Sequence, residues 1–300
     1  MESWIYLTLF AAFAQNIRSM LQKHLSGRLS ISGATFIRFF YALPFLVAYM
    51  WSLHFLPEYQ TPKFNIKFFG YAFLGGLSQI LATALLLICF KSKNFFSATV
   101  FSKTDVMQTA LFGLLILSDT ISWGSLVGIS IGLLGVAILS MMGRYYSLKE
   151  IQNAILSKPA MIGLLSGLFF GIASVFYRAS SLSISGGVLI QAAYTLAVAI
   201  IIQTTLTAIY IIYREPGQIF KILRYWKTAT LVGLFGMLAS ASWFTAMTIE
   251  NAAHVRALGQ LEIIFAYITT LYFFREKVLK SEIIGCLLII LGIFVLLIYR

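Results

Sequence analysis

Apolar runs of about twenty residues recur along this chain and limit its possible folds more than any other feature. Wound as a helix, a run of this length crosses a hydrocarbon layer of about 30 Å. Backbone groups must be paired inside lipid, and the alternation typical of a membrane barrel is absent, so helices are favoured. The sequence therefore predicts an all-α polytopic membrane protein with ten transmembrane helices, at 3–23, 32–54, 68–90, 94–117, 122–142, 159–181, 185–213, 226–248, 252–274 and 280–299.

Composition supports a lipid environment. Hydrophobic residues make up 60% of the chain and charged residues 11%, whereas a soluble domain has about a quarter of its residues charged. The net charge of +12 comes mostly from short segments between apolar runs. Basic segments beside membrane spans are attracted to anionic lipid headgroups, so we expect membrane lipid as a partner and no nucleic acid.

The chain also contains an internal repeat. With a shift of 157 residues and no gap, residues 71–143 align with 228–300. We therefore predict a first five-helix repeat at 1–143, a linker at 144–158 and a second five-helix repeat at 159–300. The most informative matches are Gly76/Gly233, Asn94/Asn251, Asp105/Glu262, Gly128/Gly285 and Gly135/Gly292.

An odd number of helices per repeat has a consequence for topology. The second repeat must enter the membrane from the side opposite to the first, which gives two inverted repeats. Inverted repeats are common among secondary transporters, in which a site between the repeats opens to each side in turn. The repeat therefore favours transport of a small solute.

The last two predicted helices carry a resemblance to a known family. The segment ALGQLEIIFAYITTLYFFREKVLKSEIIGCLLIILGIFVLL (257–297) resembles the end of EamA-type proteins in the drug/metabolite transporter superfamily. One shared feature is an acidic residue at a helix end, Glu276, followed by a final helix with Gly285 and Gly292. The first half repeats this pattern with Asp119, Gly128 and Gly135. Two early basic positions, Lys23 and Arg38, are also shared.

The resemblance implies an exporter or exchanger of amino acids, metabolites or drugs, and a multi-pass protein of the cell (inner) membrane. This chain departs from the family pattern at Ile263, where many relatives have proline. The resemblance therefore does not carry over a helix kink at this point.

Charged residues inside predicted spans are the first candidates for a substrate site, because charge in hydrocarbon is costly. Asp105 and Glu262 are repeat mates near the middle of the fourth and ninth spans. Each carboxylate can bind a cationic group, take up a proton or pair with a base. The alternative interpretation is a fixed ion pair that joins helices.

Other polar and aromatic residues at membrane depth complete the predicted substrate site. Arg18 belongs to a polar cluster in the first helix that is unsuited to lipid, and Gln191 and Tyr194 share one helical face. Lys103 lies two positions from Asp105 and is a poor partner for it. For Arg256, Arg178 and Lys23 we favour snorkelling to the headgroups, which Arg38 can also reach. The predicted substrate-binding residues are Glu262, Asp105, Arg18, Asn16, Gln15, Trp243, Tyr194 and Gln191.

Catalysis, metal binding and cofactors are not indicated. The three histidines (His24, His54 and His254) have no metal-ligand spacing, and no phosphate-binding loop is present. We therefore predict a secondary transporter of a small polar or amphipathic, amino-acid-like metabolite. One alternative is a proton-coupled exporter of lipophilic cations, and another is a membrane-embedded enzyme or a non-transporting scaffold. A homodimer is compatible with the sequence.

Overall fold

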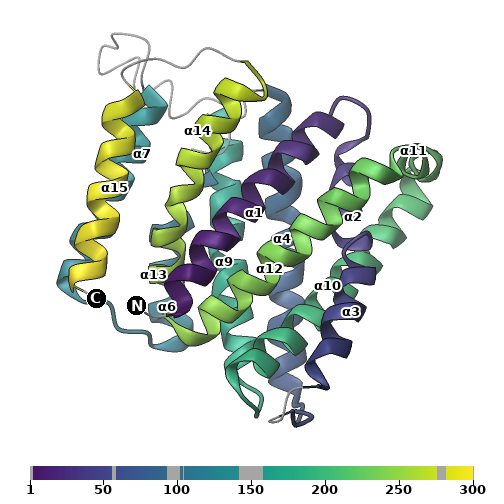
Figure 1. Cartoon of the computed structure of the whole chain (residues 1–300), viewed down its shortest axis with the longest axis horizontal. Helices are drawn as coiled ribbons and strands as arrows, with labels where there is room; N and C mark the ends of the chain where they lie inside the picture. Colours follow the sequence, from purple (N-terminus) through teal and green to yellow (C-terminus); the bar gives the residue numbers. More distant parts are fainter. Residues whose placement is uncertain are drawn as a thin grey trace.

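A computed structural model describes residues 3–55, 59–92, 102–103, 105–141, 158–275 and 282–299, and these ranges contain helices and no strand. Figure 1 shows the helices side by side in one bundle, with both chain ends at the same end of it. The helices are α1 (Ser3–Leu25), α2 (Ile31–Phe40), α3 (Leu43–Leu53), α4 (Ile66–Ser92), α6 (Asp105–Leu117), α7 (Trp123–Met141), α9 (Lys158–Leu182), α10 (Val188–Arg214), α11 (Gln218–Arg224), α12 (Trp226–Ile249), α13 (Ala252–Leu258), a 3-10 turn (Gly259–Leu261), α14 (Glu262–Tyr272) and α15 (Glu282–Tyr299).

Length and composition identify five membrane-crossing candidates in the described part of the chain, one of them formed by α2 and α3 together. They are Ile31–Leu53, Ile66–Lys91, Met161–Leu182, Val188–Arg214 and Trp226–Ile249, and Asp105–Leu117, Trp123–Gly135 and Leu287–Tyr299 are shorter apolar helices. The first helix, α1, is not among the five candidates. Its second half contains Gln15, Asn16, Arg18 and Gln22, which lower its hydropathy but are buried inside the protein.

Two predicted spans are broken in the structure. The span predicted at 32–54 divides into α2 and α3, and Pro44 lies at the start of α3. Proline cannot donate the backbone hydrogen bond that a continuous helix requires. The span predicted at 252–274 divides at the turn Gly259–Leu261, so this helix is interrupted although Ile263 replaces the proline of relatives.

The contacts between helices follow the internal repeat. α1 packs on α12 and α9 on α4, so the first predicted span of each half contacts the third predicted span of the other half. α7 and α15, which correspond to the fifth predicted span of each half, pack against each other at one edge of the bundle (Figure 1). The linker predicted at 144–158 lies outside the described residues except for Lys158.

Glycines of the repeat bring α7 and α15 into backbone contact. A Cβ atom on Gly128 would lie 2.7 Å from the carbonyl oxygen of Gly292, and one on Gly135 would lie 2.7 Å from that of Gly285. Gly128 is the repeat mate of Gly285, and Gly135 is the repeat mate of Gly292. Each glycine of α7 therefore contacts the repeat mate of the other one. The two helices are therefore antiparallel, and their glycines allow the two backbones to approach closely.

We expect Gly128→Ala to destabilise the protein, because the added methyl group meets backbone atoms of α15 that cannot rotate away. The matched control is Gly70→Ala on α4, where an added Cβ has nothing within 4 Å. Thermal unfolding of both variants in detergent measures the effect. A midpoint for Gly128→Ala equal to that of Gly70→Ala would contradict the packing.

Candidate functional site

Charged side chains gather in the interior of the bundle, between helices of both repeats. The buried acids are Asp105 and Glu262, which are 0% and 3% exposed. They are the first residues of α6 and α14.

Glu262 is held by groups from the first repeat. Its Oε2 accepts a hydrogen bond from Gln15 Nε2 at 2.6 Å and forms an ion pair with Lys103 Nζ. Gln15 in turn accepts a hydrogen bond from the indole Nε1 of Trp243 at 3.0 Å. Gly259 allows this arrangement, because a Cβ there would collide with the ring of Trp243.

Asp105 is paired with Arg256 from the second repeat. The carboxylate Oδ2 accepts a hydrogen bond from Arg256 Nη2. The guanidinium of Arg256 also lies over the rings of Trp243 and Phe170, 5.1 and 5.8 Å from their centroids. Arg256 is therefore a buried partner of Asp105, and the expectation that it snorkels is wrong.

The two ion pairs are reciprocal. Asp105 and Glu262 are repeat mates, and each binds a base from the opposite repeat. In each case the base lies a few residues before the acid of its own repeat. Lys103 pairs with Glu262, and Asp105, two residues later, pairs with Arg256. The pairs therefore join the two repeats at their interface.

Three further polar residues of α1 and α2 are buried around the pairs. Asn16 Nδ2 donates to Thr269 Oγ1 at 2.7 Å, and Arg38 Nη1 donates to Thr83 Oγ1 at 2.6 Å. Arg38 is 3% exposed, so it is buried rather than snorkelling. Arg18 is 1% exposed, and its Nη2 donates to Ser19 Oγ at 3.1 Å.

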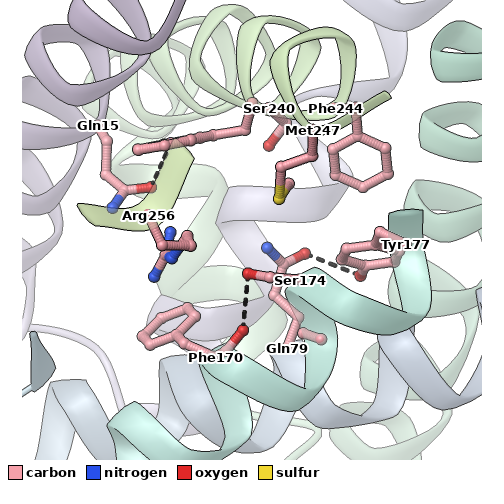
Figure 2. A pocket seen from close by; sticks show the side chains of 11 residues that line it. Gln15, Gln79, Phe170, Ser174, Tyr177, Ser240, Phe244, Met247 and Arg256 are labelled. Atoms are coloured by element: carbon pink, nitrogen blue, oxygen red, sulfur yellow. Dashed lines mark hydrogen bonds between the residues drawn. The ribbon is translucent and has the colours of Figure 1, made fainter. Parts of the chain in front are cut away.

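A small cavity adjoins this cluster. Its volume is about 20 Å³, room for about one water molecule. Figure 2 shows Gln15 and Arg256 on one side of it and Tyr177 and Phe244 on the other. The Tyr177 hydroxyl donates to Oε1 of Gln79, another lining residue, at 3.0 Å, and Gln203 Nε2 donates to the same oxygen at 2.6 Å.

Basic residues lie near each end of the bundle on the first helix of each repeat. Arg178 of α9 donates to the backbone carbonyls of Met247 and Glu250 and lies 3.7 Å from the carboxylate of Asp119. Its contacts are with protein groups, so the snorkelling prediction is wrong here too. Lys23 of α1 lies 4.1 Å from the centre of the Phe274 ring, at the other end.

Two predicted site residues lie elsewhere. Gln191 Nε2 donates to the Ile184 carbonyl at 2.8 Å, and the Tyr194 hydroxyl is 2.6 Å from that of Tyr59. Both are near the start of α10, and Tyr194 packs in a separate cluster with Leu53 and Ile190. The structure thus brings together Glu262, Asp105, Asn16, Gln15 and Trp243, with Arg18 beside them, and leaves Gln191 and Tyr194 apart.

A larger cavity of about 670 Å³ lies between α2, α4 and α10. Its walls are mostly apolar, and its two charged residues, Lys91 and Glu215, lie at the ends of α4 and α10. Hydrogen bonds from Ser30 and Ser32 lower the pKa of Glu215. This cavity contains neither of the ion pairs that join the repeats.

Several residues of the central site were not predicted from the sequence. Tyr177, Gln203 and Phe170 line the cavity or support its wall. Gln203 lies in the apolar run of α10, and a polar residue within hydrocarbon was a usable signal. Nothing in the pattern around Phe170 distinguishes it from a lipid-facing residue. Among the described residues, no group of three or more His, Cys, Asp or Glu side chains is placed to hold a metal ion.

The fold and the buried site define a polytopic membrane protein with charged groups shared between two repeats. The sequence profile of the EamA-like transporter family matches residues 2–141 and 157–298. The chain therefore belongs to the EamA-like transporter family, within the drug/metabolite transporter superfamily.

A comparison with solved structures supports the fold. A crystal structure of another protein superposes with a TM-score of 0.70 at 16% sequence identity, over 98% of this chain and 97% of that chain. At this level of identity the similarity concerns the fold alone. No curated protein matches the sequence significantly.

We expect the Asp105–Arg256 pair to be energetically coupled. Arg256→Met leaves a buried carboxylate without its counter-charge and costs about 3–5 kcal/mol of stability. The double variant Asp105→Asn/Arg256→Met recovers a large part of this loss, because neither remaining group is charged. The free energy of unfolding is measured in mixed micelles for Arg256→Met, for Asp105→Asn and for the double variant. Strictly additive effects would contradict the pairing.

Proposed function

We propose that this protein is a secondary transporter that moves a small polar or amphipathic, amino-acid-like metabolite across the cell (inner) membrane, as an exporter or an exchanger. The mechanism is alternating access. Ten spans form two five-helix repeats of opposite orientation, and the solute binds between them.

The two ion pairs that join the repeats support this function most strongly. Lys103–Glu262 and Asp105–Arg256 are buried where the repeats meet, and buried charged pairs are costly to assemble. Packing alone does not require such groups, because an apolar interface of similar shape is often as stable. The charged groups serve transport, because each can exchange its partner on the protein for a group on the solute.

The antiparallel packing of mates supports the inverted arrangement. α7 and α15 are the fifth helices of the two repeats. Across their interface Gly128 contacts Gly292, and Gly135 contacts Gly285. When one repeat rocks against the other, contacts at one end of the bundle open while their counterparts at the other end close. The contacts of Arg178 and Lys23 lie at these two ends.

The small central cavity corresponds to a closed state in this mechanism. Sites for small molecules usually have volumes of about 300–1,000 Å³. The space beside Gln15 and Arg256 is about 20 Å³, so a solute enters only after the surrounding helices separate. Met247 lines this cavity, and its carbonyl accepts a hydrogen bond from Arg178, which links the cavity wall to one end of the bundle.

Counterflow in vesicles that contain only the purified protein tests the proposal. Labelled solute should accumulate inside when unlabelled solute is preloaded, without ATP. Glu262→Gln should lower the initial rate about tenfold or more, because Lys103 then lacks its counter-charge.

The matched control for this variant is Glu215→Gln, the same chemical change at a carboxylate that follows the last residue of α10. It should transport at the normal rate. Folding of both variants is checked by size-exclusion chromatography. A correctly folded Glu262→Gln protein with normal counterflow would remove Glu262 from the mechanism.

A further inference from the structure

We infer that the solute of the central site is an organic anion, whose carboxylate or phosphate oxygens bind the guanidinium of Arg18. This inference rests on the proposed transport function and specifies the chemistry that the site selects.

The balance of buried charge is the first observation. The described buried side chains include four strong bases, Arg18, Arg38, Lys103 and Arg256, but only two acids, Asp105 and Glu262. Each acid already has one of the bases as its partner. The site therefore keeps an excess of two positive charges, which a bound anion would neutralise.

The hydrogen bonding of Arg18 is the second observation. A guanidinium has five N–H donors, and its geometry matches the paired oxygens of a carboxylate or phosphate. Ser19 accepts one hydrogen bond from Nη2, while Nε and Nη1 are buried and have no acceptor among the described residues. A buried guanidinium that lacks acceptors is costly unless another group supplies them.

The position of Arg18 places these donors at the site. Arg18 is three residues after Gln15 on α1, so the two side chains share one helical face. Gln15 lines the central cavity and donates to Glu262. Arg18 packs against Gly236 of α12. A Cβ atom on this glycine would lie 3.6 Å from Arg18 Cδ. The free donors of Arg18 thus lie on the same face of α1 as Gln15, which contacts the Lys103–Glu262 pair.

Unpaired acceptors nearby refine the chemistry of the solute. Asp105 Oδ1 and Asn16 Oδ1 are buried without a donor among the described residues. A hydroxyl group on the same anion that reaches either oxygen would satisfy it. A solute with net positive charge, such as a lipophilic cation, would instead meet the excess of bases and two carboxylates that are already paired.

An unbiased exchange experiment tests the inference. Vesicles with the purified protein are loaded with unlabelled metabolite extract and placed in uniformly carbon-13-labelled extract, and mass spectrometry identifies the labelled compounds that enter beyond protein-free vesicles. We expect compounds with net negative charge, and the outcome distinguishes carboxylates from phosphate esters. Entry of neutral or cationic compounds only would overturn the inference and leave transport standing. Entry of no compound would overturn both.

A variant pair tests the role of Arg18 with the compound so identified. Arg18→Gln should lower its exchange rate about tenfold or more, because a charge-assisted hydrogen bond to the anion is lost. Arg18→Lys should recover part of the rate, since it keeps the charge without the paired donors. The matched control, Arg214→Gln at the exposed end of α10, should exchange normally.

Folding is verified for each variant by size-exclusion chromatography and thermal unfolding. If Arg18→Gln fails to fold, the test uses Arg18→Lys, and the exchange rate is measured as a function of solute concentration. A raised half-saturation concentration in Arg18→Lys supports the inference. Normal exchange by a folded Arg18→Gln protein, or an unchanged half-saturation concentration in Arg18→Lys, would contradict it.

Discussion

The pairing of buried charge is the constraint on which the rest of the structure depends. Asp105 and Glu262 are buried where a lone carboxylate would be strongly destabilising, and each is matched by a base from the other repeat. The two repeats are therefore joined by electrostatics as well as by packing, and a movement that separated them would break these pairs.

The local structure places these groups. α6 and α14 begin at the two acids. The turn at Gly259–Leu261 interrupts the chain just before Glu262, and the absent side chain of Gly259 leaves space for Trp243. Interrupted helices are tolerated at membrane depth where they border a protein site, and in transporters such sites bind the solute.

Part of this arrangement was predictable from the sequence. The repeat identified Asp105 and Glu262 as mates, and the polar cluster of α1 indicated a buried face, because such residues are unsuited to lipid. Their partners were not predictable. Lys103 and Arg256 are brought to the acids by helices of opposite repeats, and a pairing over 151 or 159 residues leaves no periodicity in the sequence. Tyr194 and Gln191 satisfied the same criterion of depth, but they lie at the start of α10, away from the acids. The turn at Gly259–Leu261 was missed because no proline marks it, and a single glycine such as Gly259 also occurs within continuous helices.

Access to the central cavity from each side of the membrane is the most direct test of two repeats that move around a shared site. A single cysteine at Ser174, a cavity-lining position, is introduced after Cys89 and Cys286 are replaced by alanine. An impermeant thiol reagent is then applied to vesicles of either orientation. The inverted-repeat mechanism predicts labelling from both faces, and added solute should change the two rates in opposite directions or lower both. Labelling from one face only, unaffected by solute, would contradict it.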